Sequence, residues 1–193
     1  MINDLVVIDT ETSGIDPFEN DLLSIAFVPT SPQIPSIEIH VKYSKIVWNK
    51  FAKENFKKFE STWTNESISP ADACNEIEKY LSRYYPSKNV IPIGHNISFD
   101  LSFIRKLAHR GKRDHIEGLS HRSIDTHTLL YILHMENLVP KWATTSTGAF
   151  EYFNISVDNA ARHTAKGDAL ATKVLFQKIL QMFHQITHKD NSL

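Results

Sequence analysis

The sequence contains one cysteine, Cys74, so the chain can form no internal disulfide and no multi-cysteine zinc site. Such sparing use of cysteine fits a reducing compartment, and we expect a cytoplasmic protein. Glycine and proline are also few, at 6 and 8 residues, which excludes fibrous and low-complexity material. No apolar run approaches the roughly 20 residues of a membrane helix, and the apolar run at residues 5–8 is too short for a signal peptide.

An excess of charge of one sign is absent as well. The 21 lysines and arginines nearly balance the 22 aspartates and glutamates, so the overall charge does not indicate a nucleic-acid partner. With 41% hydrophobic residues, the 193-residue chain can bury an ordinary core. It shows no internal repeat and no linker, and we therefore expect a single domain over residues 1–193. Any binding of nucleic acid has to depend on a local site.

Hydrophobic patterns predict an α/β domain with a mixed sheet. Three consecutive strands are expected at residues 5–12, 21–28 and 37–43, which favours an antiparallel meander. A helix begins at Pro70 with Ser69 as its cap, and Pro92 makes the strand at 89–93 short or an edge. Further helices are expected at 100–110, 126–136, 144–153 and 164–188, with a short strand at 122–124. The last helix is expected to turn inward Leu170, Val174, Leu175, Ile179 and Phe183.

Two carboxylates stand two residues apart at the end of the first strand. Residues i and i+2 of a strand point to one face, so Asp9 and Glu11 project together. Like charges this close resist joint ionisation, and a divalent cation with a preference for oxygen ligands, such as Mg²⁺ or Mn²⁺, resolves the conflict. Because an isolated D-x-E also occurs by chance at solvated strand ends, the pair needs support from other residues.

Two further stretches supply candidates for that support. Asp100 follows a strand end in the segment GHNISFD, and neighbouring strand ends can bring it near Asp9 and Glu11. The alternative is that Asp100 only stabilises the helix dipole, as an aspartate in a first helical turn commonly does. His163 and Asp168 form H-x4-D, and a five-residue offset puts them on different helix faces, so both reach one site only if His163 precedes the helix. The alternative is a surface histidine beside an aspartate that stabilises the helix dipole.

Taken together, these residues form three ordered motifs: VVIDTETSG at 6–14, HNISFDLSFI at 95–104 and HTAKGD at 163–168. They resemble the DEDD superfamily of 3′-to-5′ exonucleases, in the histidine-containing branch that includes the proofreading epsilon subunit of bacterial replicative polymerase, ribonuclease T and oligoribonuclease. The segment IDTHTLL, which begins at Ile124, is similar to a further stretch of the family. The resemblance covers nearly the whole chain, but residues 44–69 match no family pattern.

The resemblance implies a ribonuclease-H-like fold, with a five-stranded mixed sheet flanked by helices and the second strand antiparallel. It implies that Asp9, Glu11, Asp100 and Asp168 hold two Mg²⁺ or Mn²⁺ ions, and that His163 is the general base. The enzyme is expected to hydrolyse the 3′ ends of nucleic acids, single-stranded DNA in particular, to nucleoside 5′-monophosphates. An exoribonuclease acting on short RNA and a catalytically silent nucleic-acid-binding module remain as alternatives.

Substrate contacts are expected beside these motifs. Ile15 and Phe99 are candidates for packing on the terminal bases, and Thr12 is a candidate for a hydrogen bond to the terminal 3′ hydroxyl. Phe99 is equally well explained as an anchor of the core. Aromatic residues and lysines interleave over residues 48–63, where they form either a strand-binding lip or, as we favour, an amphipathic surface helix.

Overall fold

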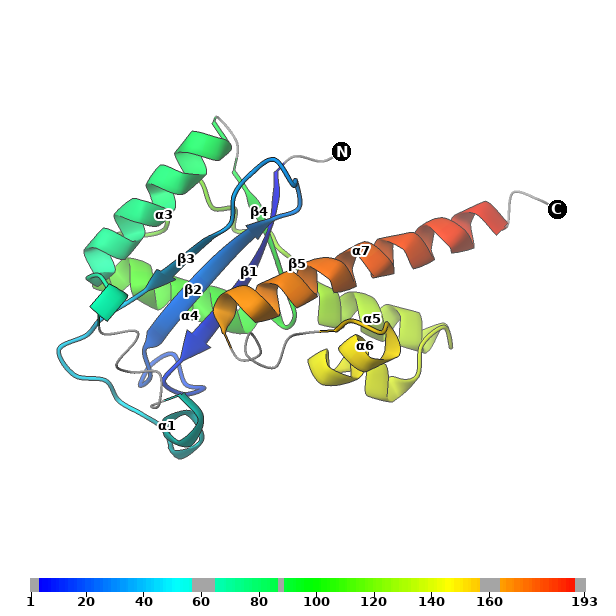
Figure 1. The fold of residues 1–193 in the computed structure, drawn as a ribbon, viewed down its shortest axis with the longest axis horizontal. Helices are drawn as coiled ribbons and strands as arrows, with labels where there is room; N and C mark the ends of the chain where they lie inside the picture. Colours follow the sequence, from blue (N-terminus) through cyan, green and yellow to red (C-terminus); the bar gives the residue numbers. More distant parts are fainter. Residues whose placement is uncertain (1–3, 57–64, 87–88, 157–163, 190–193) are drawn as a thin grey trace.

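The computed structural model in Figure 1 describes residues 4–56, 65–86, 89–156 and 164–189. A five-stranded sheet with the order β3-β2-β1-β4-β5 forms its centre. The strands are β1 (Leu5–Thr12), β2 (Leu22–Pro29), β3 (Ile37–His40), β4 (Ile91–Gly94) and β5 (Ile124–Asp125). β2 is antiparallel to both of its neighbours, while β1, β4 and β5 run parallel. The predicted mixed sheet and its antiparallel meander are confirmed.

Helices cover both faces of this sheet. They are α1 (Lys50–Phe56), α3 (Pro70–Tyr84), α4 (Ile97–Arg110), α5 (Thr126–Met135), the 3₁₀ helix η2 (Lys141–Thr144), α6 (Ser146–Tyr152) and α7 (Ala165–Lys189). Side chains alternate along β1, so Val6 and Ile8 join a core with α3 and α4. Leu5 and Val7 point to the other face and pack against α7. The central strand is therefore buried on both sides.

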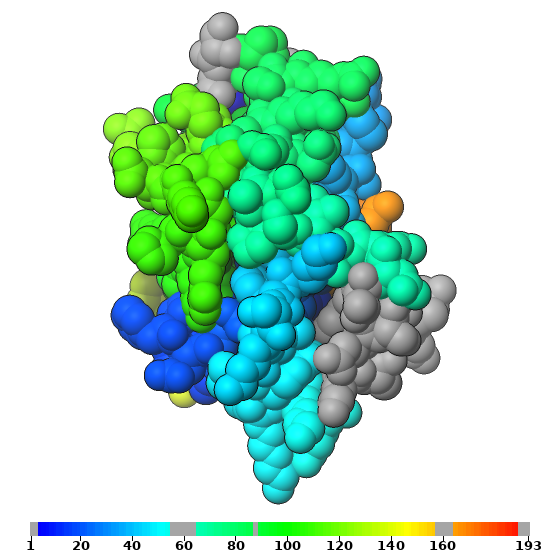
Figure 2. All heavy atoms as spheres, turned by 90° about the vertical axis from the view of Figure 1, so that its left-hand side faces the viewer, coloured from blue at the N-terminus to red at the C-terminus, as the bar shows by residue number. Residues whose placement is uncertain are grey.

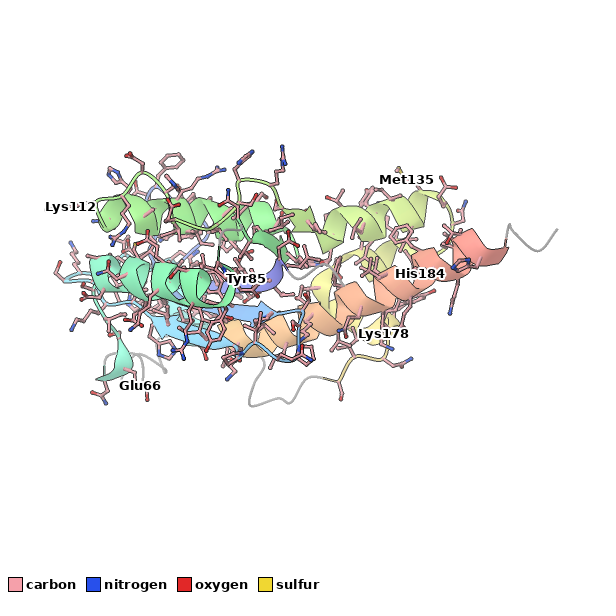
Figure 3. The ribbon with its side chains drawn as sticks, turned by 90° about the horizontal axis from the view of Figure 1, so that it is seen from above. Glu66, Tyr85, Lys112, Met135, Lys178 and His184 are labelled. Carbon is pink, nitrogen blue, oxygen red and sulfur yellow. The ribbon has the colours of Figure 1, made fainter. Side chains whose placement is uncertain are left out.

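A further core lies beside the sheet, between α5, α6 and the part of α7 from Ala171 onward. Its fully buried members include Leu130, Leu133, Leu175 and Ile179. Seen from above, Met135, Lys178 and His184 lie toward one end of the molecule and Lys112 at the other (Figure 3). The prediction that Leu170 and Val174 face inward is wrong, because they are 46% and 39% exposed. α7 instead buries a neighbouring stripe that contains Ala169, Thr172 and Phe176.

Of the two alternatives predicted for the strand of Pro92, the short strand is confirmed, because β4 has 4 residues, and the edge strand is wrong. β4 lies between β1 and β5, and Pro92 is opposite Val6 of β1. The backbone N–H of Ile91 donates toward the β1 side, to Asp4 O at 2.8 Å, so the nitrogen of Pro92 faces the β5 side. Pairing with β5 begins only at Ile93, so the missing N–H of proline leaves no hydrogen bond unmade.

Other local predictions were closer to the structure. The hydroxyl of Ser69 accepts a backbone hydrogen bond at the start of α3, which confirms it as the cap. Cys74 is fully buried, as expected of a small core residue. The third strand ends at His40, three residues earlier than predicted. Val41 follows it with a hydrogen bond of 2.8 Å from its N–H to Leu23 O of β2, and it also forms an isolated bridge with Ile68. Among the described residues, no helix is both long enough and apolar enough to cross a membrane.

Candidate active site

Three carboxylates converge at one place on the face of the sheet that α7 covers. Ligand oxygens of Asp9, Glu11 and Asp168, one from each, all lie within 4.8 Å of one another. Asp9 and Glu11 share a face of β1 with Leu5 and Val7, which pack against α7. Asp168 comes from the first turn of α7. Residues of the first and third motifs, more than 150 positions apart in the chain, thus meet in one cluster.

The start of α7 explains how Asp168 reaches the sheet. The hydroxyl of Thr164 accepts from the backbone N–H of Gly167 at 3.1 Å, and its carbonyl accepts from the N–H of Asp168 at 3.0 Å. This cap sets where the helix begins. The residues that face the sheet, Ala165 and Ala169, are small and fully buried. Small side chains allow a close approach of the helix, so the short side chain of Asp168 reaches β1.

The cluster repels itself electrostatically. Glu11 is only 7% exposed, and Asp9 and Asp168 are half-buried. Two unit charges 4.8 Å apart repel by about 1 kcal/mol in water and by about 3.5 kcal/mol at an effective dielectric constant of 20. The positive end of the α7 dipole offsets part of this repulsion. Because carboxylate oxygens are the ligands that Mg²⁺ and Mn²⁺ prefer, the donor set fits a divalent cation.

Asp100 approaches β1 from the opposite face. Its Oδ1 accepts a hydrogen bond of 2.7 Å from the hydroxyl of Thr10, which lies between Asp9 and Glu11 in the sequence and so points the other way. Burial raises the pKa of Asp100 to about 7, and the hydrogen bond from Thr10 works against that rise. Asp100 does not belong to the three-carboxylate cluster among the described residues. The structure therefore brings together three of the four predicted carboxylates and holds the fourth across the strand.

The other candidate residues have different environments. The hydroxyl of Thr12 donates to Gly14 O at 2.6 Å, and Ile15 is 76% exposed on the loop that follows β1. Phe99 is half-buried, with its ring 5.0 Å from that of Phe103, and it packs against the main core. This contact fits the reading of Phe99 as a core anchor. The candidate base His163 lies outside the described residues, as do Lys57, Lys58, Phe59 and Trp63 of the segment 48–63. The described part of that segment contains the helix α1, in agreement with the favoured surface helix.

The sequence reasoning missed Phe18, which is 92% exposed on the same loop as Ile15. This loop is held rigidly. The N–H of Phe18 donates to Asp16 Oδ1 at 2.8 Å, and Asn20 donates to Val47 O at 3.0 Å. A side chain at Gly14 would meet Asn20 at 2.2 Å, so glycine is required for this packing. The signal that could have revealed Phe18 is an aromatic residue inside a run of turn-forming residues, D-P-F-E-N, where a loop needs none.

His95 of the second motif has a structural part in the turn between β4 and α4. Thr126 donates to Gly94 O at 3.1 Å, so its oxygen accepts from Nδ1–H of His95, also at 3.1 Å. Asn96 adopts a left-handed conformation, with φ of 62°, and its N–H donates to Asp125 Oδ1 at 2.8 Å. Burial lowers the pKa of His95 to about 4, with a further contribution from His127. The hydrogen bonds between the second motif and the Ile124 segment thus hold the end of β4 next to the end of β5.

Comparison with known proteins places these features in context. No family model matches the chain. Ribonuclease T of Wigglesworthia glossinidia brevipalpis is 25% identical to it, over 94% of this chain and 86% of the relative. Ribonuclease T of Hahella chejuensis is 26% identical, over 94% of this chain and 85% of the relative. E. coli exonuclease I, solved with a dT13 oligonucleotide, superposes with a TM-score of 0.75 at 15% identity. That superposition covers 97% of this chain and 42% of exonuclease I, so the chain spans less than half of that protein.

The sheet, its flanking helices and the likeness to exonuclease I define a ribonuclease-H-like nuclease fold. The carboxylate cluster is compatible with the divalent cations that such nucleases require. Together with the ribonuclease T relatives, these findings confirm the resemblance seen in the motifs. The ribonuclease T relatives and the exonuclease I neighbours support a 3′-5′ exonuclease of the DEDD superfamily, and they are consistent with its histidine-containing branch.

Proposed function

We propose that the chain, acting as one exonuclease domain over residues 1–193, hydrolyses single-stranded nucleic acid from the 3′ end and releases nucleoside 5′-monophosphates. We further propose that it acts in the cytoplasm and prefers DNA to RNA. The observation that carries the proposal is the convergence of Asp9, Glu11 and Asp168. Its likeness in fold to an exonuclease solved with a dT13 oligonucleotide supports a single-stranded DNA substrate.

We assign Asp9, Glu11, Asp100 and Asp168 as the residues that hold two Mg²⁺ or Mn²⁺ ions. When bound, such ions supply the positive charge that stabilises the phosphate oxygens and the leaving 3′ oxygen in the transition state. The carboxylates account for metal dependence in a second way. With a formal net charge of −1 and an acidic site, the protein repels a phosphate backbone unless cations occupy the cluster.

Asp100 has a distinct part in this assignment. A buried carboxyl group with a pKa near 7 holds either a proton or a nearby cation. The hydrogen bond from Thr10 favours the ionised form and orients the carboxylate against β1. Because Asp100 lies across β1 from the other three carboxylates, we expect it to share a cation with them only at the C-terminal end of that strand, and to be ionised when a cation is bound there. Thr10 acts through Asp100 as a positioning residue.

His163 is assigned as the general base that takes the proton of the attacking water. An ordinary histidine pKa lies near neutral pH, which suits a group that takes and returns a proton in each turnover. The assignment is supported by the H-x4-D motif, whose aspartate, Asp168, belongs to the carboxylate cluster.

The exposed side chains on the loop after β1 are assigned to the terminal bases. Ile15 and Phe18 present apolar surface immediately after the strand that carries Asp9 and Glu11. Stacking on aromatic and apolar surfaces accepts every base, as a nonspecific exonuclease requires. Thr12 retains acceptor capacity for the terminal 3′ hydroxyl, because its own proton is donated to Gly14. Phe99 would contribute through the part of its ring that stays exposed.

An exoribonuclease is the second candidate, because the curated relatives carry the name ribonuclease T. The two are separated with matched DNA and RNA oligonucleotides, labelled at the 5′ end and offered as single strands and as duplexes. We expect shortening of single strands in Mg²⁺ or Mn²⁺, faster for DNA than for RNA. Faster shortening of RNA would replace the DNA preference with the exoribonuclease. Failure to shorten any of these substrates would overturn the proposal.

A further inference from the structure

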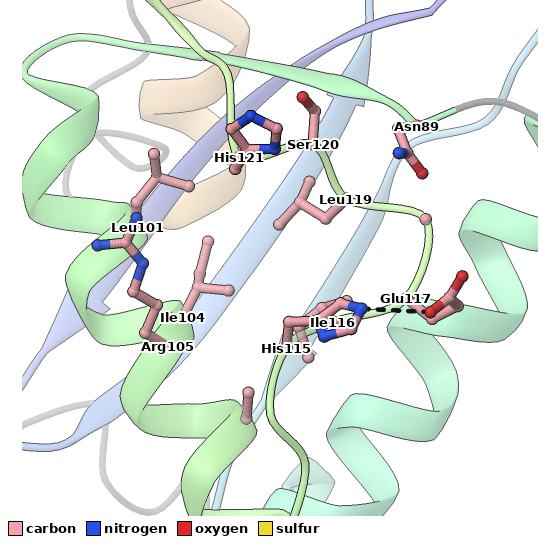
Figure 4. A pocket seen from close by; sticks show the side chains of 12 residues that line it. Asn89, Leu101, Ile104, Arg105, His115, Ile116, Glu117, Leu119, Ser120 and His121 are labelled. Carbon is pink, nitrogen blue, oxygen red and sulfur yellow. Dashed lines mark ion pairs between the residues drawn. The ribbon is translucent and has the colours of Figure 1, made fainter.

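A cleft on the flank of α4, which we name the α4 cleft, lies apart from the carboxylate cluster. It encloses about 320 Å³ between α4 and the segment 115–121 (Figure 4). Its apolar lining consists of Leu101, Ile104, Ala108, Ile116 and Leu119. Polar side chains of Arg105, His115, His121, Asn89 and Ser120 stand around this lining (Figure 4). An apolar floor with a few polar groups at the rim is the usual form of a small-molecule site.

The wall of the α4 cleft opposite the helix is preformed. The N–H of Val90 donates to Gly118 O, and the N–H of Ser120 donates to Val90 O, both at 2.8 Å. Residues 118–120 are therefore paired with the residue that precedes β4. An ion pair of 3.2 Å between Arg113 and Glu78 anchors the chain that leads into it. Gly118 has a φ of 82°, a conformation that favours glycine. A rigid wall means that a ligand need not order the site on binding.

The charges at the rim favour an anion. Arg105 is exposed and forms no ion pair among the described residues, so its guanidinium is available. His121 stands beside the same opening (Figure 4). The one carboxylate in the lining, Glu117, lies 3.3 Å from Nε2 of His115 and stands across the cleft from Arg105 (Figure 4). A planar guanidinium at the edge of an apolar floor matches a ligand that joins a flat ring to a phosphate.

We propose that the α4 cleft is a second nucleotide-binding site, which takes a nucleoside monophosphate unit with its base on the apolar floor and its phosphate at Arg105. Asp100 and Arg105 are on one helix, five positions apart, which separates them by about 7.5 Å along its axis and by about 140° around it. The cleft therefore lies on another face of α4 than Asp100, and a nucleotide there is either a unit of a longer strand that passes around the helix to the active site or a released product. A unit of the substrate strand as the source rests on the proposed function, whereas binding of a free nucleotide does not.

The binding test uses thymidine 5′-monophosphate and the whole chain in EDTA, so that no cation can hold the nucleotide at the carboxylate cluster. We expect binding, with amide NMR shifts concentrated in residues 115–121. Thymidine without the phosphate should bind more weakly. Arg105→Gln should weaken binding of the monophosphate about tenfold or more, as expected for loss of a charge-assisted hydrogen bond. Arg105→Lys, which keeps the charge, should recover part of the affinity.

Arg83→Gln is the matched control, because it removes the same charge from another exposed helix position outside the cleft. It should leave binding unchanged. Arg105→Gln should melt at the temperature of wild type because Arg105 is exposed, whereas Arg83→Gln is compared by binding alone because Arg83 lies over the Tyr84 ring, 5.4 Å from its centroid. The proposal is overturned if wild type does not bind the monophosphate in EDTA, if shifts fall elsewhere, or if Arg105→Gln binds as tightly as wild type. A protein that shortened no oligonucleotide but passed this test would lose the proposed function and keep the nucleotide site.

Kinetics then separate the two sources. If the cleft holds a unit of the substrate strand, Arg105→Gln raises KM for an octanucleotide and not for a dinucleotide. If it holds released product, added monophosphate inhibits wild type without competing with the substrate, and Arg105→Gln relieves the inhibition. A variant with unchanged KM and unchanged product inhibition would refute a role of the cleft in the reaction.

Discussion

Neutralising Asp9 should raise the melting temperature of the protein without metal and should reduce its stabilisation by Mn²⁺. Asp9→Asn keeps the size of the side chain and removes one of three negative charges whose ligand oxygens lie within 4.8 Å of one another. Each of the two pairs that involve Asp9 contributes a repulsion of about 1–3.5 kcal/mol, depending on the effective dielectric constant. Asp9 is half-buried, so solvent screening reduces the measurable gain to about 1–2 kcal/mol.

In EDTA, Asp9→Asn should therefore melt roughly 2–8 °C above wild type, from the usual slope of about 2–4 °C per kcal/mol for a chain of this size. Added Mn²⁺ should raise the melting temperature of wild type by ligand linkage, and should raise that of the variant little or not at all. Exonuclease activity of the variant should fall below about 1% of wild type, since a cation ligand is lost.

The assay is thermal unfolding in EDTA and in millimolar Mn²⁺, together with hydrolysis of a labelled oligonucleotide. Asp114→Asn is the control, because it removes an exposed carboxylate that lies outside the cluster. It should change neither the melting temperature nor the activity. The reasoning is refuted if Asp9→Asn is less stable than wild type in EDTA and still gains the full stabilisation from Mn²⁺.

Three further outcomes are expected. His163→Ala should lower kcat by roughly 10²–10⁴-fold, the usual contribution of a general base, and an unchanged rate would remove it from the mechanism. Phe18→Ala should raise KM for oligonucleotides roughly fivefold or more, from the loss of about 1–3 kcal/mol of stacking, whereas Met135→Ala, which removes another exposed apolar side chain, should not. His95, with its pKa lowered to about 4, stays neutral in the folded state, while in the unfolded chain it takes up a proton below about pH 6.5. The contribution of neutral His95 to the free energy of unfolding is therefore complete above pH 6.5 and is lost as the pH falls toward 4. Over that range, denaturant unfolding should show that wild type loses about 1–3 kcal/mol more of its free energy of unfolding than His95→Gln does. Parallel pH curves for the two proteins would contradict this.

The first strand and its carboxylates could be predicted because the evidence for them is local. An apolar run that ends in D-T-E specifies both a buried strand and two carboxylates on one face. The same alternation turns Thr10 to the other face, and the structure shows Asp100 bonded there. Sequence reasoning brought Asp100 toward the site from the order of strand ends, but the side of β1 that α4 covers depends on the packing of the whole sheet.

The errors arose where packing overrides local pattern. Leu170 and Val174 are as apolar as their buried neighbours, and only the position of the sheet decides which stripe of α7 is covered. Pro92 occupies the interior of the sheet because its neighbour β5 is too short to need the missing N–H. Phe18 escaped notice because a single exposed aromatic residue in a loop has no periodicity to reveal it.

The central claim is that carboxylates from β1 and α7 hold the cations with which the chain shortens nucleic acid from its 3′ end. Its most direct test follows a single-stranded oligonucleotide, labelled at the 5′ end, with wild type and Asp168→Asn in Mn²⁺ and in EDTA. We expect wild type in Mn²⁺ to produce a ladder of shortened strands that all keep the label, and no ladder in EDTA or with the variant. Release of the label as the first product, or a ladder that persists in EDTA, would contradict the account.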